Sequence, residues 1–212
     1  MPNSIASIGS SAFSGCSSIT NLQIGDYVTS IGSNAFKDCK ALQEITLGNK
    51  ISTIGNDAFS GCSGLTKAHV NDIDSWFNIS FGNSLSTPIN ENCSLYVNGT
   101  KVTSIEIPQG TTTIQNYSLY KFSGITNITI PSSVESIGAS AFGMCSNLQS
   151  ITMSEGVKSI GSSAFYGTNI KALSIPNSVE SIGSAIIGKC SNIEELRIPF
   201  MGAKETRFDD AY

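Results

Sequence analysis

Val28-Thr29-Ser30-Ile31-Gly32-Ser33-Asn34-Ala35-Phe36 is the stretch that decides the fold. It is followed at fixed spacing by Cys39, Leu42, Ile45 and Leu47. The same residue types recur in rows of 23, and three rows agree without a gap at residues 2–24, 25–47 and 48–70. A fixed period of about 20 to 50 residues is typical of solenoids and other repeat proteins. We therefore expect a stack of similar coils.

Four further rows continue the pattern after a gap. They lie at residues 108–130, 131–153, 154–175 and 176–198. The row 154–175 is one residue short, between Phe165 and Ile170. Residues 71–107 form an irregular insert between the third and fourth of the seven repeats, and we interpret residues 199–212 as a partial irregular repeat or a cap. We expect residues 1–212 to form one solenoid domain.

Each row predicts one strand and one tight turn. The row end, as in residues 148–153, alternates apolar and polar residues, which is typical of a strand with one buried face. The segment 137–142 has Ile, Ala and Phe at spacings that favour a short helical or 3₁₀ turn on the opposite side. Stacked rows then predict an α/β solenoid, a right-handed leucine-rich-repeat superhelix with parallel strands on one face and these turns on the other.

Glycine follows the column isoleucine in six of the seven rows, and only Gln115 departs. The glycines are Gly9, Gly32, Gly55, Gly138, Gly161 and Gly183. A β-carbon at this position would obstruct either a positive φ angle or close packing of the backbone. If successive coils stack about 4.8 Å apart, each Phe, Ile and Leu has a like neighbour in the coil above and in the coil below.

The composition limits the classes of partner. Apolar residues make up 40% of the 212, which is enough for a substantial core, whereas charged residues make up only 13%. The net charge is −4 and there is no basic run, which argues against a nucleic-acid partner. No apolar stretch reaches the roughly 18 residues of a membrane span, so we expect no direct membrane insertion. Residues 1–5 show no secretory signal.

The unit Ile-Gly-x-x-Ala-Phe-x-x-Cys-x-x-Leu-x-x-Ile-x-Ile-Pro closely resembles the BspA-like leucine-rich repeats of surface proteins from anaerobic bacteria and some parasitic protists. The resemblance covers residues 2–70 and 108–198, and residues 76–82 with 95–99 resemble an irregular repeat of that family. It implies a cell-surface or extracellular protein that mediates adhesion or protein–protein interaction. It supplies no catalytic residues.

The insert has two recognisable parts. Residues 72–77 predict a short helical turn that Asp72 or Asp74 could cap. Asn98-Gly99, between two apolar stretches, predicts a hairpin with a type I′ turn. The insert also carries the only tryptophan, Trp76. It could form a recognition protrusion, but we favour the interpretation that Trp76 and Phe77 fill the core where the normal turn is missing.

Five of the six cysteines share one column, namely Cys16, Cys39, Cys62, Cys145 and Cys190, and the insert holds Cys93. Cys145 and Cys190 lie two coils, about 10 Å, apart and cannot form a disulfide. Whether two adjacent cysteines among Cys16, Cys39 and Cys62 form a disulfide is left open. The column also accepts Phe122, which indicates an apolar core slot, so we expect buried free thiols. A linear column cannot surround a metal ion, and we expect no metal and no cofactor.

His69 is the only histidine, on the exposed side of a predicted strand. If the insert merely loops out, His69 could contact Glu106. Catalysis would need a nucleophile nearby and a pocket that excludes water, and a flat strand face offers none. We therefore expect no enzymatic activity and no catalytic residues.

The outward residues of the stacked strands are the best candidate surface for a partner. Candidate binding residues are Glu44, Thr46, Lys67, His69, Glu106, Thr129, Thr152 and Arg197 on the strands, with Trp76 and Tyr96 from the insert. Such a face is continuous and preformed. Equally, small polar residues there could serve only to stabilise the sheet through cross-strand pairs. Few aromatic or arginine anchors are present.

Three functions fit these features. The leading hypothesis is a monomeric protein-interaction or adhesion module of the cell surface that uses the strand face and the insert. Glycan recognition through Asn and Thr with Trp76 and Tyr96 is an alternative. The third is an inert spacer in a longer surface array.

Overall fold

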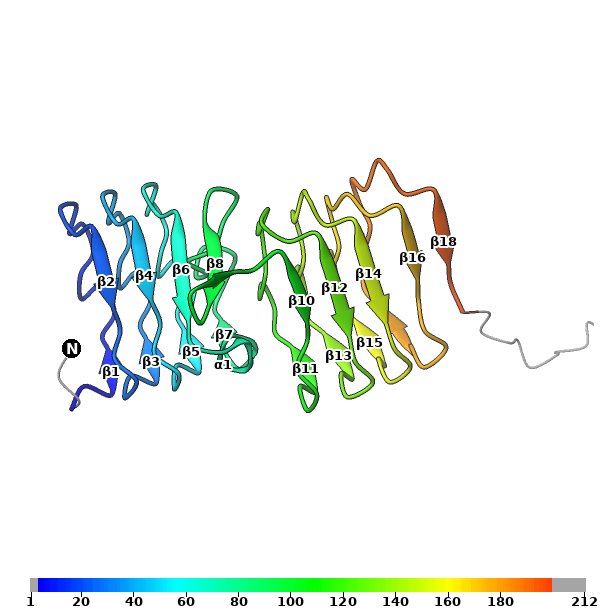
Figure 1. Cartoon of the computed structure of the whole chain (residues 1–212), viewed down its shortest axis with the longest axis horizontal. Coiled ribbons are helices and arrows are strands. Elements are labelled where there is room, and N and C mark those ends of the chain that lie inside the picture. Colours follow the sequence, from blue (N-terminus) through cyan, green and yellow to red (C-terminus); the bar gives the residue numbers. More distant parts are fainter. Residues whose placement is uncertain (1–3, 200–212) are drawn as a thin grey trace, which may run out of the picture.

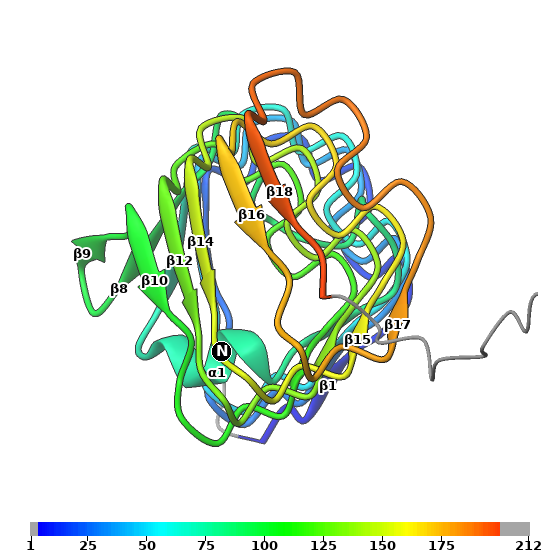
Figure 2. The same cartoon turned by 90° about the vertical axis from the view of Figure 1, so that its right-hand side faces the viewer.

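The computed structural model describes residues 4–199, which form an elongated stack of coils (Figure 1). Seen along the stack, each coil runs through a longer strand on one side and a two-residue strand on another, and turns close the remaining side (Figure 2). Like strands of successive coils pair in parallel, so one coil lies directly on the next. The predicted solenoid is confirmed.

The longer strands in residues 4–199 number nine, of which seven coincide with the strand predicted at the end of each row and two lie in the insert. They are β2 (Asn21–Gln23), β4 (Glu44–Thr46), β6 (Lys67–Val70), β8 (Ser94–Val97), β10 (Ser104–Glu106), β12 (Asn127–Ile130), β14 (Ser150–Met153), β16 (Ala172–Ser174) and β18 (Glu195–Arg197). They form three parallel groups, β2-β4-β6-β8, β10-β12-β14 and β16-β18. We call the solvent-facing side of these strands the strand face.

A second set of parallel strands was not expected from the sequence. It contains β1 (Ser7–Ile8), β3 (Ser30–Ile31), β5 (Thr53–Ile54), β7 (Ser80–Phe81), β11 (Thr113–Ile114), β13 (Ser136–Ile137), β15 (Ser159–Ile160) and β17 (Ser181–Ile182). These strands form the sheets β1-β3-β5-β7 and β11-β13-β15-β17. The column isoleucine therefore lies in a strand, where alternation points it into the core.

The short helical or 3₁₀ turns predicted after the column glycine are wrong. In the coil that contains Phe36 the chain forms successive turns, and Asn34 and Asp38 adopt φ angles of 57° and 58°. The amide of Phe36 donates to Ala58 O of the next coil (2.9 Å), whereas the amide of Lys37 donates back to Asn34 O (3.1 Å). A helix would direct all of these amides along its own axis, so alternating turns hold adjacent coils together better. The right-handed sense of the superhelix stays a prediction.

The column glycine permits a close approach between coils. A β-carbon at Gly32 would lie 2.5 Å from Ser10 N, and one at Gly161 would lie 2.5 Å from Ala139 N. The approach comes with a hydrogen bond, because Gly32 N donates to Ile8 O at 2.8 Å. Close packing of the backbone, and not a positive φ angle, therefore explains the glycine at this position.

The core consists of ladders of like side chains. Phe13, Phe36 and Phe59 stack with ring centroids 5.3 and 5.5 Å apart, and Phe142 stacks on Phe165 at 5.7 Å. Phe36 is 1% exposed. Because each coil buries its apolar side only against its neighbours, the ladders make the stability of one coil depend on the next.

Residues 71–97 form a coil of their own within the stack. Ala68 of β6 pairs with Leu95 of β8, 27 positions later, and the helix α1 (Ile73–Phe77) accommodates the additional residues of this longer coil. The predicted helical turn is confirmed, and Asp72 caps it by accepting from Ser75 N at 2.7 Å.

A hairpin ends the first half of the stack. Strand β9 (Thr100–Lys101) pairs antiparallel with β8, and the turn residues Asn98 and Gly99 have φ angles of 46° and 77°, so the predicted hairpin is confirmed. Because β9 occupies the outer edge of β8, β10 has no partner there and begins a new group of strands (Figure 1). Trp76 Nε1 bridges the break by donating to Ser118 O at 2.9 Å.

All six cysteines are free thiols, so no bridge links the first three. Their thiols contribute to coil stacking: Cys39 Sγ lies 3.2 Å from Phe13 O, Cys62 Sγ 3.1 Å from Phe36 O, and Cys145 Sγ 2.9 Å from Leu119 O. Burial raises the pKa of the Cys62, Cys93 and Cys145 thiols to about 12. The column is therefore part of the core, as the sequence predicted.

Replacing Phe36 with Ala should lower the free energy of unfolding by about 3–5 kcal/mol, because it leaves a cavity in the aromatic ladder. Thr152→Ala, on the exposed side of β14, should change it by less than about 0.5 kcal/mol. Chemical denaturation of both variants measures the difference. Equal costs would contradict the assignment of inside and outside.

The buried thiols predict a loss of stability at high pH. The pKa of Cys145 is raised from 9.0 in the unfolded chain to about 12 in the folded one, so between these values only the unfolded state releases the proton. This contribution is therefore intact below about pH 9 and declines as pH rises. Cys145→Ala should make the decline shallower in denaturation series from pH 8 to 11. An unchanged pH dependence would mean that this thiol is accessible to water in the folded protein.

Candidate binding face

The strand face presents residues of successive coils in exact columns. Thr46 pairs with His69, and His69 pairs with Tyr96. Glu44 pairs with Lys67 in the neighbouring column. Parallel pairing at one register places like positions about 4.8 Å apart along the stack. The first half of the stack thus brings five of the predicted binding residues together.

Four of these residues make direct contacts, and we call them the β4–β8 cluster: Glu44, Lys67, His69 and Tyr96. Lys67 Nζ lies 3.7 Å from Glu44 Oε2. His69 Nε2 lies 2.7 Å from Glu44 Oε1, although the carboxylate is not aligned for a hydrogen bond. The rings of His69 and Tyr96 stack with centroids 4.9 Å apart and planes at 21°. The Glu44 carboxylate therefore lies next to two basic side chains, and the ring of Tyr96 packs against one of them, His69.

The cluster is ordered but accessible. The side chains of Glu44 and Lys67 are 39% and 48% exposed, and that of His69 is 23% exposed. Each member stands on a strand that pairs with its neighbours, so little backbone freedom is left to lose on binding. A partner would meet a preformed surface that combines charge with an aromatic edge.

The predicted contact between His69 and Glu106 is wrong. It assumed that the insert loops out, whereas β8 continues the sheet and places Tyr96 beside His69. Glu106 belongs to β10 on the far side of the break, where it pairs with Thr129. The insert therefore separates these two residues.

Trp76 cannot contact a partner, so its assignment as a binding residue is wrong. It is 0% exposed, and its ring lies 5.5 Å from that of Phe81. The preferred interpretation, that Trp76 and Phe77 fill the core, is confirmed. Its indole N–H finds an acceptor in the second half of the stack, as a buried tryptophan requires.

The second half of the strand face is sparser. Glu106, Thr129 and Thr152 form one exposed column across β10, β12 and β14. Arg197 of β18 pairs with its neighbour Glu195 at 2.6 Å from Nε to Oε1, and both are more than half exposed. These side chains make no cluster comparable to that of the first half.

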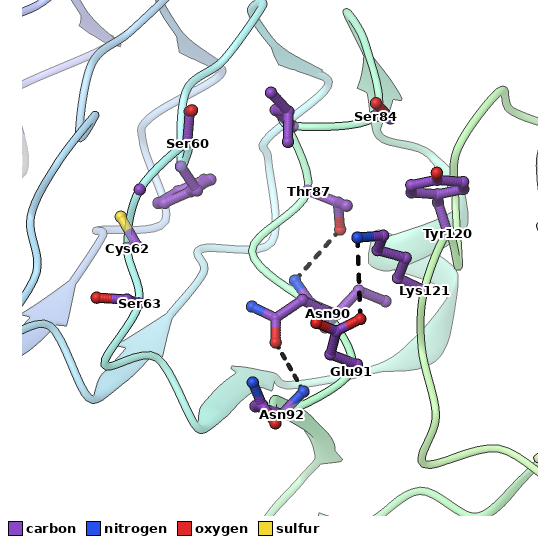
Figure 3. A pocket seen from close by; sticks show the side chains of 14 residues that line it. Ser60, Cys62, Ser63, Ser84, Thr87, Asn90, Glu91, Asn92, Tyr120 and Lys121 are labelled. Carbon is purple, nitrogen blue, oxygen red and sulfur yellow. Dashed lines mark hydrogen bonds and ion pairs between the residues drawn. The ribbon is translucent and has the colours of Figure 1, made fainter. Parts of the chain in front are cut away.

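A pocket of about 300 Å³ lies where the two halves meet on the turn side (Figure 3). Its walls come from the turn around Phe59–Cys62, the loop at residues 84–92 and the turn of Tyr120 and Lys121. The loop is tied to the second half, because Lys121 Nζ lies 3.8 Å from Glu91 Oε2 and Ser123 Oγ donates to Glu91 O at 2.6 Å. No sequence pattern predicts this pocket, because residues distant in the sequence meet to form it.

The chemistry of the pocket is limited. Its thiol, Cys62, has a pKa raised to about 12 by burial and stays protonated at neutral pH, so it is a poor nucleophile. Within residues 4–199, no group of three or more His, Cys, Asp or Glu side chains is placed to hold a metal ion. In the same part of the chain, no helix has the length and apolar character needed to cross a bilayer.

Solved structures of similar fold come from bacteria. The pneumococcal vaccine antigen PcpA is 18% identical with a TM-score of 0.52, over 91% of this chain and 67% of that one. A leucine-rich-repeat protein of Eubacterium ventriosum is 21% identical with a TM-score of 0.51, over 91% and 57%. A leucine-rich cell surface protein of Faecalibacterium prausnitzii is 22% identical with a TM-score of 0.42, over 91% and 42%. The chain thus spans 42% to 67% of the lengths of these three chains.

No curated protein matches the sequence. The model of the BspA type leucine rich repeat region, by contrast, matches in six copies that cover residues 1–97 and 76–194. The matched part includes every coil from β1 to β16, the irregular one included. Together with the 23-residue period and the stacked parallel strands, this match places the chain in the BspA-type leucine-rich-repeat family.

Proposed function

We propose that this protein is a non-enzymatic, surface-associated binding protein that recognises another protein through the first half of its strand face. The observation that carries the proposal is the β4–β8 cluster, in which Glu44, Lys67, His69 and Tyr96 stand in register on paired strands. Members of the family are typically associated with the cell surface, which supports the proposed location.

The cluster has the properties that favour protein recognition. Aromatic side chains are enriched at the energetically dominant positions of interfaces, and Tyr96 is held flat against His69. Partly exposed charges contribute more to specificity and association rate than to affinity, and Glu44 and Lys67 are such charges. The proposed partner surface therefore pairs an acidic group with Lys67 and covers the Tyr96 edge.

The two alternatives have less support. Glycan recognition relied on two aromatic residues, and Trp76 is buried in the core. A mere spacer has no need of a charged and aromatic cluster, since small polar residues such as Thr129 and Thr152 suffice to solvate the sheet. Protein recognition is the function that uses the cluster.

Reversing the charges of the cluster should abolish binding. We expect Glu44→Lys and Lys67→Glu each to reduce the recovery of bound proteins at least tenfold in quantitative pulldowns from bacterial and epithelial surface extracts, because each leaves two like charges adjacent. Mass spectrometry of the captured proteins gives the measurement.

Glu135 and Lys158 provide a matched control. Their side chains form an exposed ion pair of 3.0 Å beside β13 and β15, away from the strand face. Glu135→Lys and Lys158→Glu should leave capture unchanged. The proposal fails if cluster and control variants capture the same proteins in the same amounts as the original chain.

A further inference from the structure

Strand β10 has an open edge in the middle of the stack. It pairs with β12 on one side, but among the strands of residues 4–199 none pairs with it on the other side (Figure 1). The chain that precedes β10 turns back along β8 as β9, and Figure 2 shows β9 projecting outward from the row of β10, β12 and β14. We call the unpaired side of residues 103–106 the β10 edge.

The carbonyl of Glu106 lacks the hydrogen bond that its column makes in other coils. On the strand face, Thr46 O accepts from Ile24 N of the preceding coil at 2.9 Å. Thr129 O accepts from Ile107 N in the same way, also at 2.9 Å. Glu106 is the register partner of Thr129, so its carbonyl is directed toward the place of a preceding strand. Within residues 4–199 no backbone amide donates to it.

The amide of Thr103 lacks a partner at the other end of the same edge. At the start of the strands, Gln43 N donates to Thr20 O at 2.7 Å, and Thr126 N donates to Thr103 O at 2.8 Å. Thr103 N itself has no backbone acceptor in the described part of the chain. Unpaired amides and carbonyls along a strand form a template on which another strand can pair. The β10 edge therefore has a donor and an acceptor available for an added strand.

An apolar hollow of about 200 Å³ lies beside the β10 edge. Its lining consists of Ile73, Val97, Val102, Ser104, Ile105 and Glu106. Ile73, Val97 and Val102 pack against the core but are only partly buried, so water meets apolar side chains in the middle of the stack. Removing this surface from water is favourable by the hydrophobic effect. A strand that pairs with the edge and directs an apolar side chain into the hollow gains from both interactions.

Glu106 determines the charge that such a strand should carry. It is the one charged residue in the lining of the hollow, it is exposed, and within residues 4–199 it forms no ion pair. In the first half of the strand face, Lys67 lies opposite Glu44 on the neighbouring strand, with Nζ 3.7 Å from Oε2. A basic side chain opposite Glu106 would repeat this cross-strand pair.

We propose that the β10 edge receives an extended segment of a partner protein, which pairs as a parallel strand and carries a lysine or arginine next to an apolar residue. The apolar side chain fills the hollow, and the basic side chain lies beside Glu106. The backbone of the segment supplies a donor for Glu106 O and an acceptor for Thr103 N. In strand addition of this kind, main-chain bonds give affinity and side-chain pockets give specificity. The site is separate from the β4–β8 cluster and does not depend on the partner of that cluster.

A peptide based on residues 103–107, with lysine in place of the glutamate, is a suitable probe. Acetyl-Thr-Ser-Ile-Lys-Ile-Thr-amide places its lysine opposite Glu106 and turns the amides of both isoleucines toward β10. Fluorescence anisotropy of the labelled peptide should show saturable binding to the full chain. N-methylation of both isoleucine amides removes the donors and should weaken binding about tenfold or more. N-methylation of the serine and lysine amides, which face away from β10, should leave binding unchanged.

Charge exchange tests where the peptide binds. Glu106→Lys should weaken binding about tenfold or more, and a peptide with glutamate in place of the lysine should bind this variant as the original pair does. Glu135→Lys is the matched control, because it makes the same change at an exposed glutamate away from the strand face. This control should leave binding unchanged, and so should Glu44→Lys in the β4–β8 cluster.

Absence of peptide binding overturns the proposal, as do equal affinities of the two methylated peptides or a charge exchange that restores no binding. Loss of binding in Glu44→Lys would assign the peptide to the β4–β8 cluster and would contradict the proposal. Sedimentation velocity of the chain alone tests a second copy as the occupant. A dimer that Glu106→Lys dissociates would assign the β10 edge to that second copy and would overturn the proposal as well.

Discussion

The structure depends on one constraint: the backbone of each coil must approach the backbone of the previous coil closely enough for hydrogen bonds along the whole turn. At Gly161 no β-carbon fits, because Ala139 N would lie 2.5 Å away. The amides of the turn then alternate between the next coil and the residue three positions back. Phenylalanine rings and thiols follow this spacing and fill the interior. Packing, hydrogen bonding and the solvent-facing columns are all consequences of the same approach.

The irregular coil shows how the stack tolerates a break. Helix α1 lengthens this coil, and β9 closes the edge of β8. Trp76 then connects the halves through its bond to Ser118 O, and Glu91 does so through Lys121 and Ser123. The same coil places Tyr96 beside His69, so the candidate binding cluster exists because the insert is built into the sheet.

Much of this could be predicted from the sequence, because a 23-residue period determines where strands and core columns lie. The hairpin at Asn98-Gly99 and the Asp72 cap were predictable because they depend on local chemistry. The turns were wrongly predicted to be helical, because the spacing of Ile, Ala and Phe fits both a helical turn and the observed turns. Only the hydrogen bonds between coils distinguish the two. The stacking of Tyr96 on His69 was not predicted, because the irregular insert does not follow the 23-residue period from which the pairing of β8 with β6 could be counted. The pocket at the junction was not predicted either, because its walls come from distant coils.

Amide hydrogen exchange at the column positions tests the close approach most directly. Gly32, Gly55, Gly138, Gly161 and Gly183 each donate to an isoleucine carbonyl of the preceding coil at 2.8 Å. Gln115 follows β11, and no strand pairs with β11 on its N-terminal side. We expect strong protection at the five glycine amides and fast exchange at the Gln115 amide in the same sample. Fast exchange at the glycines, or equal protection at Gln115, would contradict the account.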